Sequence, residues 1–212
     1  MTKILTLALA ALLFVTTEAT ATRPTKGRPV KTGQTLSYGT GSDGNLQNGL
    51  SPMFKDLGNG VIKDQRSGLF WEKKSNDGSI HDKDNTYTWG QGASPFSMNG
   101  TMVTTFLATL NTPPCFGGYC DWRIPNIKEM FSLRSYDMSG SGSFHAFDTG
   151  CTAGCTVTSC SCTRPYYYWT STTSQGYEAN AWLVGFGFGS LGEVIDDGKA
   201  GSGYVRAVRS ES

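Results

Sequence analysis

The segment CDWRIPNIKEM, residues 120–130, predicts a strand end, a sharp turn and the start of a helix in direct succession. Pro125 has no amide hydrogen for a ladder and disfavours helical dihedrals at the residue before it, so we expect extended backbone up to this point. Asn126 is a favourable N-cap, and Glu129, three residues later, completes a capping box. The apolar residues that follow have helical spacing: Ile127, Met130, Phe131 and Leu133. This corner is therefore expected to dock a short helix on a hydrophobic core.

The composition bounds the class of protein. The chain has 212 residues, of which 17% are charged and 12% aromatic, and it contains 27 glycines. This length suffices for one domain with a substantial core, and the profile is typical of a strand-rich globule with long loops. The formal net charge is +1, so we expect no nucleic-acid partner.

The N-terminus has the pattern of a secretory signal peptide over residues 1–21. Lys3 precedes a short apolar run at residues 4–15, and the small residues Ala19 and Ala21 mark a cleavage site. Residues 22–30 are basic and Pro-rich and are expected to form a leader, followed by a single domain over residues 31–209. No other segment has membrane length, so we expect an exported chain without a membrane span, located in the periplasm, on the cell surface or outside the cell.

The cysteines fit the export signal, because an even number of cysteines in an exported chain indicates disulfides. Cys115 and Cys120 flank the flexible sequence FGGY and are expected to meet. The other four have three possible pairings: Cys151, Cys155, Cys160 and Cys162. A Cys-rich metal site is the alternative, but the spacing lacks the C-x2-C knuckles of structural zinc sites, and disulfides are favoured.

Local patterns predict further elements along the chain. Asn59-Gly60 is a two-residue turn signal within a hairpin over residues 54–71. Apolar residues at helical spacing predict a helix over residues 101–110. Strands are expected at residues 31–38, 166–173, 181–189 and 204–209, with a loop over residues 39–49.

Together these segments resemble the Lcl C-terminal domain family, a bacterial group described as a domain of unknown function. The resemblance runs over residues 31–209 and rests on the order of several motifs: KTGQT at 31–35, GLFWEK at 68–73, DWRIPN at 121–126, YWTSTT at 168–173 and YVRAVR at 204–209. Each motif alone is short, and their order makes the assignment specific.

The family is similar to C-type lectin-like domains. The resemblance therefore implies an α+β fold in which two helices pack on small twisted antiparallel sheets, with long loops and disulfides. It also implies structural roles for Trp71, Trp122, Arg123, Pro125 and Trp182, with Trp122 as a core anchor and Arg123 as a pairing partner. The calcium and sugar motifs of true C-type lectins are absent from the sequence, so we expect no metal and no cofactor.

The best-known relative in the family is an adhesin domain that binds sulfated polysaccharides, which implies an adhesin-like binding module for glycans or a surface-protein ligand. Aromatic platforms with hydrogen-bonding neighbours recognise carbohydrate. The ligand-binding residues expected on this basis are Tyr166, Tyr167, Trp169, Ser171, Thr172, Asp196, Asp197 and Lys199.

Two other functions remain open. One is a structural or protein-interaction domain of the cell envelope. The other is an oxidase similar to formylglycine-generating enzymes, which use a reactive cysteine pair and copper. Here the cysteines are expected to form bridges, and His81 and His145 are the only histidines, so we expect no catalytic residues and no enzyme activity. The ligand and the oligomeric state are not determined by the sequence.

Overall fold

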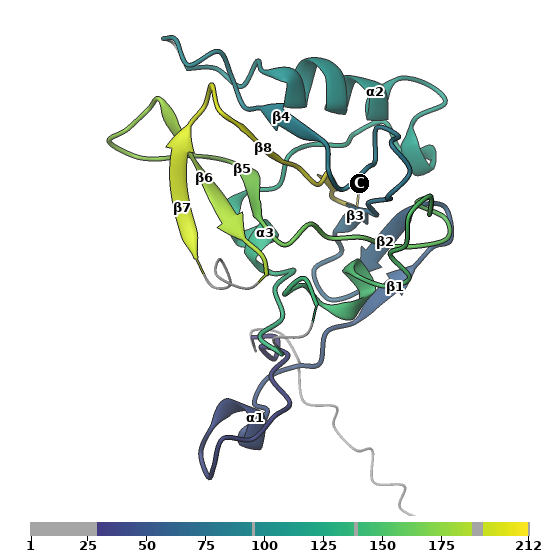
Figure 1. Cartoon of the computed structure of the whole chain (residues 1–212), viewed down its shortest axis with the longest axis vertical. Coiled ribbons are helices and arrows are strands. Elements are labelled where there is room, and N and C mark those ends of the chain that lie inside the picture. Colours follow the sequence, from purple (N-terminus) through teal and green to yellow (C-terminus); the bar gives the residue numbers. More distant parts are fainter. Residues whose placement is uncertain (1–28, 95, 138–139, 188–192, 212) are drawn as a thin grey trace, which may run out of the picture.

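The computed structural model describes residues 29–94, 96–137, 140–187 and 193–211. The expected signal peptide, residues 1–21, and most of the leader lie outside these residues. The described chain is a mixed α+β fold with a four-stranded sheet, a five-stranded sheet, short helices and three disulfides (Figure 1). The helix α1 (Asp43–Leu46) lies at one end of the molecule, apart from both sheets (Figure 1).

The four-stranded sheet has the order β1-β2-β3-β9 and is antiparallel throughout. Its strands are β1 (Phe54–Asp56), β2 (Val61–Asp64), β3 (Phe70–Glu72) and β9 (Val208–Arg209). The predicted hairpin is confirmed, with Asp56 opposite Ile62. The turn between its first two strands is longer than the expected two residues, Asn59 and Gly60, and spans residues 57–60. A hydrogen bond of 2.9 Å from the Leu57 N–H to the Val61 carbonyl closes this longer turn.

The five-stranded sheet has the order β4-β8-β5-β6-β7. Its strands are β4 (Thr86–Thr88), β5 (Tyr167–Thr173), β6 (Asn180–Gly185), β7 (Val194–Gly198) and β8 (Ser202–Tyr204). The predicted strand at 166–173 is confirmed as β5, and the one at 181–189 is present as β6 but ends at Gly185, with residues 188 and 189 outside the described chain. β5 and β8 run parallel, with Tyr168 beside Tyr204, so the expectation of purely antiparallel sheets is wrong at this pair.

The last predicted strand, residues 204–209, divides into two. Tyr204 ends β8 in one sheet and Val208 begins β9 in the other. Between them Val205, Arg206 and Ala207 are buried. This short connection joins the two sheets. Because successive side chains point in opposite directions along it, Val205 and Ala207 lie in one hydrophobic cluster and Arg206 lies in another part of the interior.

The buried residues form two clusters on opposite faces of the strands. The first contains Trp169 and Leu183 together with the helical segment at residues 102–111, and the second contains Tyr168 and Val184 together with α3 (Ile127–Phe131). Because successive strand residues point to opposite faces, each central strand contributes to both clusters. Trp71 and Trp122 are buried as expected, at 0% and 3% exposure.

The predicted corner at residues 120–130 is confirmed. The Asn126 side chain accepts hydrogen bonds from the backbone of Lys128 and Glu129, and the Glu129 carboxylate accepts from the Asn126 N–H at 2.8 Å. The same carboxylate pairs with the Arg123 guanidinium through contacts of 2.8 and 2.7 Å. The Pro125 carbonyl accepts from the Ser171 N–H on β5, which docks the corner on the sheet.

The predicted helix at residues 101–110 is present, with a different hydrogen-bonding pattern. It begins as the π-helix η1 (Met102–Leu107) and continues as α2 (Ala108–Asn111). Threonine hydroxyls compete for its carbonyls, since the Thr104 and Thr109 side chains donate to Gly100 O and Thr105 O. Two further short turns are the 3-10 helices η2 (Phe116–Gly118) and η3 (His145–Phe147).

The strand expected at residues 31–38 is wrong, and part of the expected loop at 39–49 forms α1. Leu36 and Tyr38 are 62% and 73% exposed, so this segment has no apolar face against the core. Gly33 adopts φ +91°, which ends extended backbone early in the segment.

The six cysteines form three bridges: Cys115–Cys120, Cys151–Cys162 and Cys155–Cys160. The first is the predicted pair. Disulfides persist in oxidising compartments, so the chain belongs in an extracytoplasmic setting. Within the described ranges, the helices are too short or too polar to cross a bilayer.

Candidate functional site

A cleft of ≈ 530 Å³ lies between the N-terminal segment of the described chain and the loop that follows α3. One wall consists of residues 31–35 with Gln47, Ser51 and Pro52. The other comes from residues around Ser135 and from the stretch that ends at Asp148. The cleft therefore lies outside both sheets, in the loop region between α1 and the core.

Short backbone and side-chain contacts hold the two walls together. The Tyr136 N–H donates to the Thr32 carbonyl at 2.8 Å, and the Thr35 hydroxyl donates to Asp137 Oδ1 at 2.9 Å. Gly33 is required here, because a Cβ at this position would lie 2.3 Å from the Ser135 hydroxyl oxygen. The N-terminal wall is thus fitted closely against the domain.

The lining of the cleft is rich in hydrogen-bonding groups. Exposed side chains on it supply hydroxyl, amide, carboxylate and imidazole groups, from Thr35, Ser51, Gln47, Asp137 and His145. Asp148 is held in place by the Ser141 N–H at 3.1 Å. The floor includes the ring of Phe144, which is 8% exposed. The charged side chains among the described residues of the lining are one cation, Lys31, and two carboxylates, Asp137 and Asp148.

The residues expected from the sequence to bind a ligand lie elsewhere, and two of them are buried. Trp169 is 0% exposed and its indole N–H donates to the Tyr87 carbonyl at 3.1 Å. Lys199 is 2% exposed; its ammonium lies 4.1 Å from the Trp89 ring centroid and donates to Thr173 Oγ1. Burial lowers the pKa of Lys199. Both side chains belong to the core and offer no surface to a ligand.

The other expected residues lie at separate ends of the five-stranded sheet. Tyr166 is 56% exposed and its ring contacts Tyr167 and Tyr204. The Tyr167 hydroxyl donates to Glu193, which raises the pKa of Tyr167 to about 12. Residues 171 and 172 lie toward the far end of β5, about 15 Å from position 167 at the rise of a strand.

The Thr172 hydroxyl accepts from the Ile127 N–H at 3.1 Å, so it positions α3. Asp196 accepts from the Asn180 side chain at 3.2 Å, and Asp197 is exposed on the edge strand β7. Trp182 is half-buried and belongs to neither core cluster. The structure therefore does not bring the expected ligand-binding residues together.

A buried charged network joins the two sheets. Glu72 at the end of β3 is 0% exposed and accepts from Lys74 Nζ at 3.2 Å, His81 Nδ1 at 2.8 Å and the Ala207 N–H at 3.0 Å. Arg206 is 2% exposed and donates to the Glu72 and Cys162 carbonyls at 2.8 and 2.7 Å. The sequence motifs GLFWEK and YVRAVR contain Glu72 and Arg206, but the motifs alone do not show that these residues meet.

The network is balanced internally. Burial by itself raises the pKa of Glu72, but the positive charge of Lys74 and the hydrogen bonds from His81 and Ala207 outweigh it and hold the pKa below its ordinary value. Burial lowers the pKa of Lys74, and the nearby Arg206 adds to this effect. Since Glu72, Lys74 and Arg206 are enclosed, the network acts as internal structure that fixes β3 to the connection between β8 and β9.

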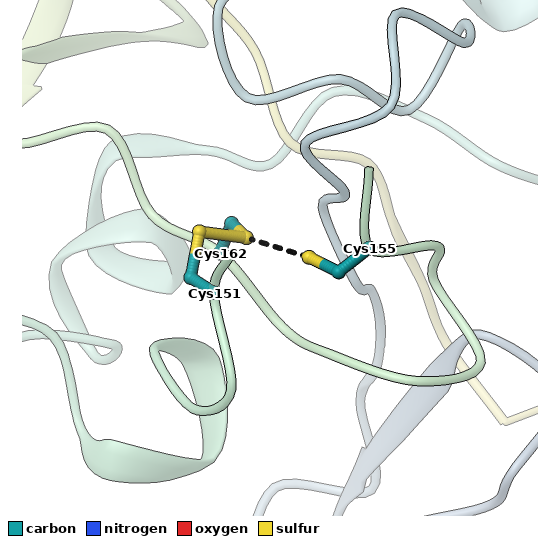
Figure 2. A group of neighbouring side chains, drawn as sticks. All are labelled: Cys151, Cys155 and Cys162. Carbon is teal, nitrogen blue, oxygen red and sulfur yellow. Dashed lines mark hydrogen bonds between the residues drawn. A yellow bond between two sulfur atoms is a disulfide. The ribbon is translucent and has the colours of Figure 1, made fainter. Parts of the chain in front are cut away.

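One group of side chains has the donor atoms of a metal site. The sulfur atoms of Cys151, Cys155 and Cys162 lie within 4.8 Å of one another (Figure 2). All three are engaged in disulfides in this structure.

Comparison with protein families matches the profile of the Lcl C-terminal domain to residues 60–209, more than half of the chain. A comparison with curated proteins finds no match. The matched range contains the corner, both sheets apart from β1 and one wall of the cleft, whereas the N-terminal wall precedes it. The chain therefore belongs to the Lcl C-terminal domain family.

Proposed function

We propose that this protein is an exported bacterial binding module, adhesin-like in character, that recognises a glycan in the cleft lined by residues from 31–52, 135–137 and 140–148. The observation that carries the proposal is a cleft of ≈ 530 Å³ whose lining combines exposed hydroxyl, amide, carboxylate and imidazole groups with the buried ring of Phe144. Sugars present hydroxyl groups that both donate and accept, and amide, hydroxyl and carboxylate side chains complement them.

The charge of the cleft favours a neutral or amino sugar over a sulfated one. A sulfated glycan requires clustered Lys or Arg side chains. The lining instead has the carboxylates Asp137 and Asp148 against Lys31. This distribution supports a neutral or amino sugar rather than the sulfated polysaccharide that the family resemblance implies.

We also propose that the fold is related to C-type lectin-like domains. Two helical segments pack on small sheets, the strands near the two ends of the domain pair with each other, and the binding cleft is formed by loops. β3 pairs with β9 near the C-terminus, which closes the domain on itself.

A protein-interaction role in the envelope is the second candidate. The segment around α1 exposes Leu36, Tyr38 and Leu46 at 62%, 73% and 54%. Exposed apolar groups gathered on one segment are typical of interaction surfaces. The oxidase alternative needs reactive thiols, and the bonded state of the six cysteines supports the binding proposal over it.

A glycan array with the purified protein tests the proposal. We expect retention of neutral or amino-sugar oligosaccharides and no retention on a heparin column at low salt. The His145 side chain is exposed in the cleft and makes no hydrogen bond or ion pair to the described residues. His145→Ala is therefore expected to weaken glycan binding while leaving the fold intact.

Tyr166→Ala is the matched control, because this exposed ring lies on the aromatic face indicated by the sequence, outside the cleft. Loss of binding in Tyr166→Ala with retention in His145→Ala moves the site to that face. Binding of envelope proteins without any glycan retention would favour the interaction role instead.

A further inference from the structure

The two disulfides that follow residue 150 lie in direct contact. The sulfur atoms of Cys155 and Cys160 are each 3.7 Å from the sulfur of Cys162, and Figure 2 shows Cys155 facing the Cys151–Cys162 bridge. The sulfur of Cys162 therefore contacts both sulfurs of the neighbouring bridge, and the sulfurs of Cys151, Cys155 and Cys162 lie within 4.8 Å of one another. The third bridge, Cys115–Cys120, joins a different loop.

We propose that Cys151, Cys155, Cys160 and Cys162, when reduced, form a site for one thiophilic divalent cation of the zinc type. In a tetrahedral thiolate site with metal–sulfur bonds of about 2.3 Å, neighbouring sulfurs are about 3.8 Å apart. The contacts of 3.7 Å from the sulfur of Cys162 to those of Cys155 and Cys160 match this spacing, and the sulfur of Cys151 lies within 4.8 Å of those of Cys155 and Cys162. To form the site, the bonded pairs have to separate and the sulfurs of Cys151 and Cys160 have to approach each other. The fold thus supplies the convergence that the sequence spacing C-x3-C-x4-C-x-C does not indicate.

The surroundings leave one side of the cluster open to solvent and fix the backbone on the other. Cys160 and Cys162 are 2% and 0% exposed, whereas Cys151 and Cys155 are half-buried and give access from solvent. The Cys162 N–H donates to the Lys74 carbonyl at 2.9 Å, and the Arg206 guanidinium donates to the Cys162 carbonyl at 2.7 Å. These two bonds fix the backbone of Cys162 between the segment that follows β3 and the connection from β8 to β9, so the sulfur of Cys162 is held in place while its neighbours move.

The cystine and metal-bound states exclude each other. Each bridge takes up two electrons and two protons from a dithiol reductant, which is itself oxidised to a disulfide. The four thiols then release four protons as the divalent cation binds four thiolates. The same sulfur atoms thus serve as cross-links under oxidising conditions and as ligands under reducing conditions.

Cobalt titration of the phosphine-reduced protein under nitrogen tests the proposal. We expect one equivalent of Co²⁺ to give the intense visible absorption and sulfur charge-transfer bands of a tetrahedral thiolate site, and Zn²⁺ to displace it. Bound Zn²⁺ should protect the four clustered cysteines from alkylation, while Cys115 and Cys120 react. Equal alkylation of all six, or only the weak bands of hexahydrated cobalt, would overturn the proposal.

Two double variants sharpen the result. Cys155→Ser with Cys160→Ser should abolish the cobalt bands, and Cys115→Ser with Cys120→Ser, the matched control, should keep them. Similar cobalt binding by both variants contradicts the site. If reduction unfolds the protein, recovery of the near-ultraviolet circular dichroism on adding Zn²⁺ supports the site, and no recovery counts against it.

Discussion

The Glu72 carboxylate is the centre of the buried network of charged groups. It is fully buried and accepts from Lys74, His81 and the Ala207 backbone, so its charge compensates a buried lysine. A buried ion pair adds little over an apolar replacement, but removal of one partner leaves the other charge without compensation.

The substitution Glu72→Gln is therefore expected to lower the free energy of unfolding by about 3 kcal/mol in urea denaturation, because Lys74 stays buried without its carboxylate. Glu211→Gln is the matched control. Glu211 pairs with Lys63 at 2.6 Å but its side chain is 62% exposed, so the same chemical change should cost less than about 1 kcal/mol there. Equal effects at the two positions would contradict the role assigned to Glu72.

The lowered pKa of Glu72 gives this contribution a direction in pH. The contribution is fully present above 4.5, the ordinary pKa of the side chain, and is lost as the pH falls through the lower folded-state value. The difference in unfolding free energy between wild type and Glu72→Gln should therefore be largest at neutral pH and shrink in acid. A difference that grows below pH 4.5 would show that the folded-state pKa is raised.

Two buried arginines make a second comparison. Arg206 donates to Glu72, Cys162 and Thr163, whereas none of the nitrogens of the Arg134 guanidinium has a hydrogen-bond partner among the described residues. Arg134 is 3% exposed and lies 5.3 and 5.0 Å from the rings of Phe131 and Tyr136. Burial lowers its pKa.

We expect Arg206→Met to destabilise the protein by about 3 kcal/mol, since several buried acceptors lose their donor. Arg134→Met should stay within about 1 kcal/mol of wild type, because ring contacts are lost while an unsatisfied buried charge is removed. Thermal unfolding of the two variants provides the measurement. If Arg134→Met lowers the thermal stability as much as Arg206→Met, the contrast between the two arginines is wrong.

The corner at residues 120–130 shows how a local motif specifies an element. Asn126 and Glu129 form the capping box that their spacing indicates, and Glu129 also holds Arg123. Hydrogen bonds from Arg123 and from the Asn126 N–H outweigh the effect of burial and lower the pKa of Glu129. The sequence reveals this element because its contacts lie within a few residues of one another.

Asn126→Ala is expected to cost about 1 kcal/mol of unfolding free energy, because two amides of α3 lose their acceptor. Asn126→Asp keeps the acceptor and should remain near wild type in the same denaturant titration. If the alanine variant matches the aspartate variant, the cap does not stabilise the corner.

The elements that the sequence did not reveal depend on long-range pairing. β4 and β7 are the edge strands of the five-stranded sheet, and β7 has the sequence VIDDG, whose charges suit an edge and hide the strand pattern. The aromatic pattern of β5 predicted a strand correctly. However, pattern alone did not separate the exposed Tyr166 from the buried Trp169, since which face meets the core depends on residues far away in the sequence.

At the scale of the whole molecule, the candidate site could not be predicted from the sequence either. Its walls come from residues within 31–52 and from residues within 135–137 and 140–148, which are remote in sequence and lack a shared motif. Only the fold places Thr35 against Asp137. The family match begins at residue 60, so one wall is built by a segment that precedes the matched domain.

Hydrogen exchange of the protein with and without its best-retained oligosaccharide tests the assignment of the cleft most directly. Binding should slow amide exchange at residues 31–35 and 141–148, on both walls, and leave β5 and β7 unchanged. Slowed exchange at residues 166–172 and 194–199 with no change in the cleft, or no slowing with any oligosaccharide, would contradict the account.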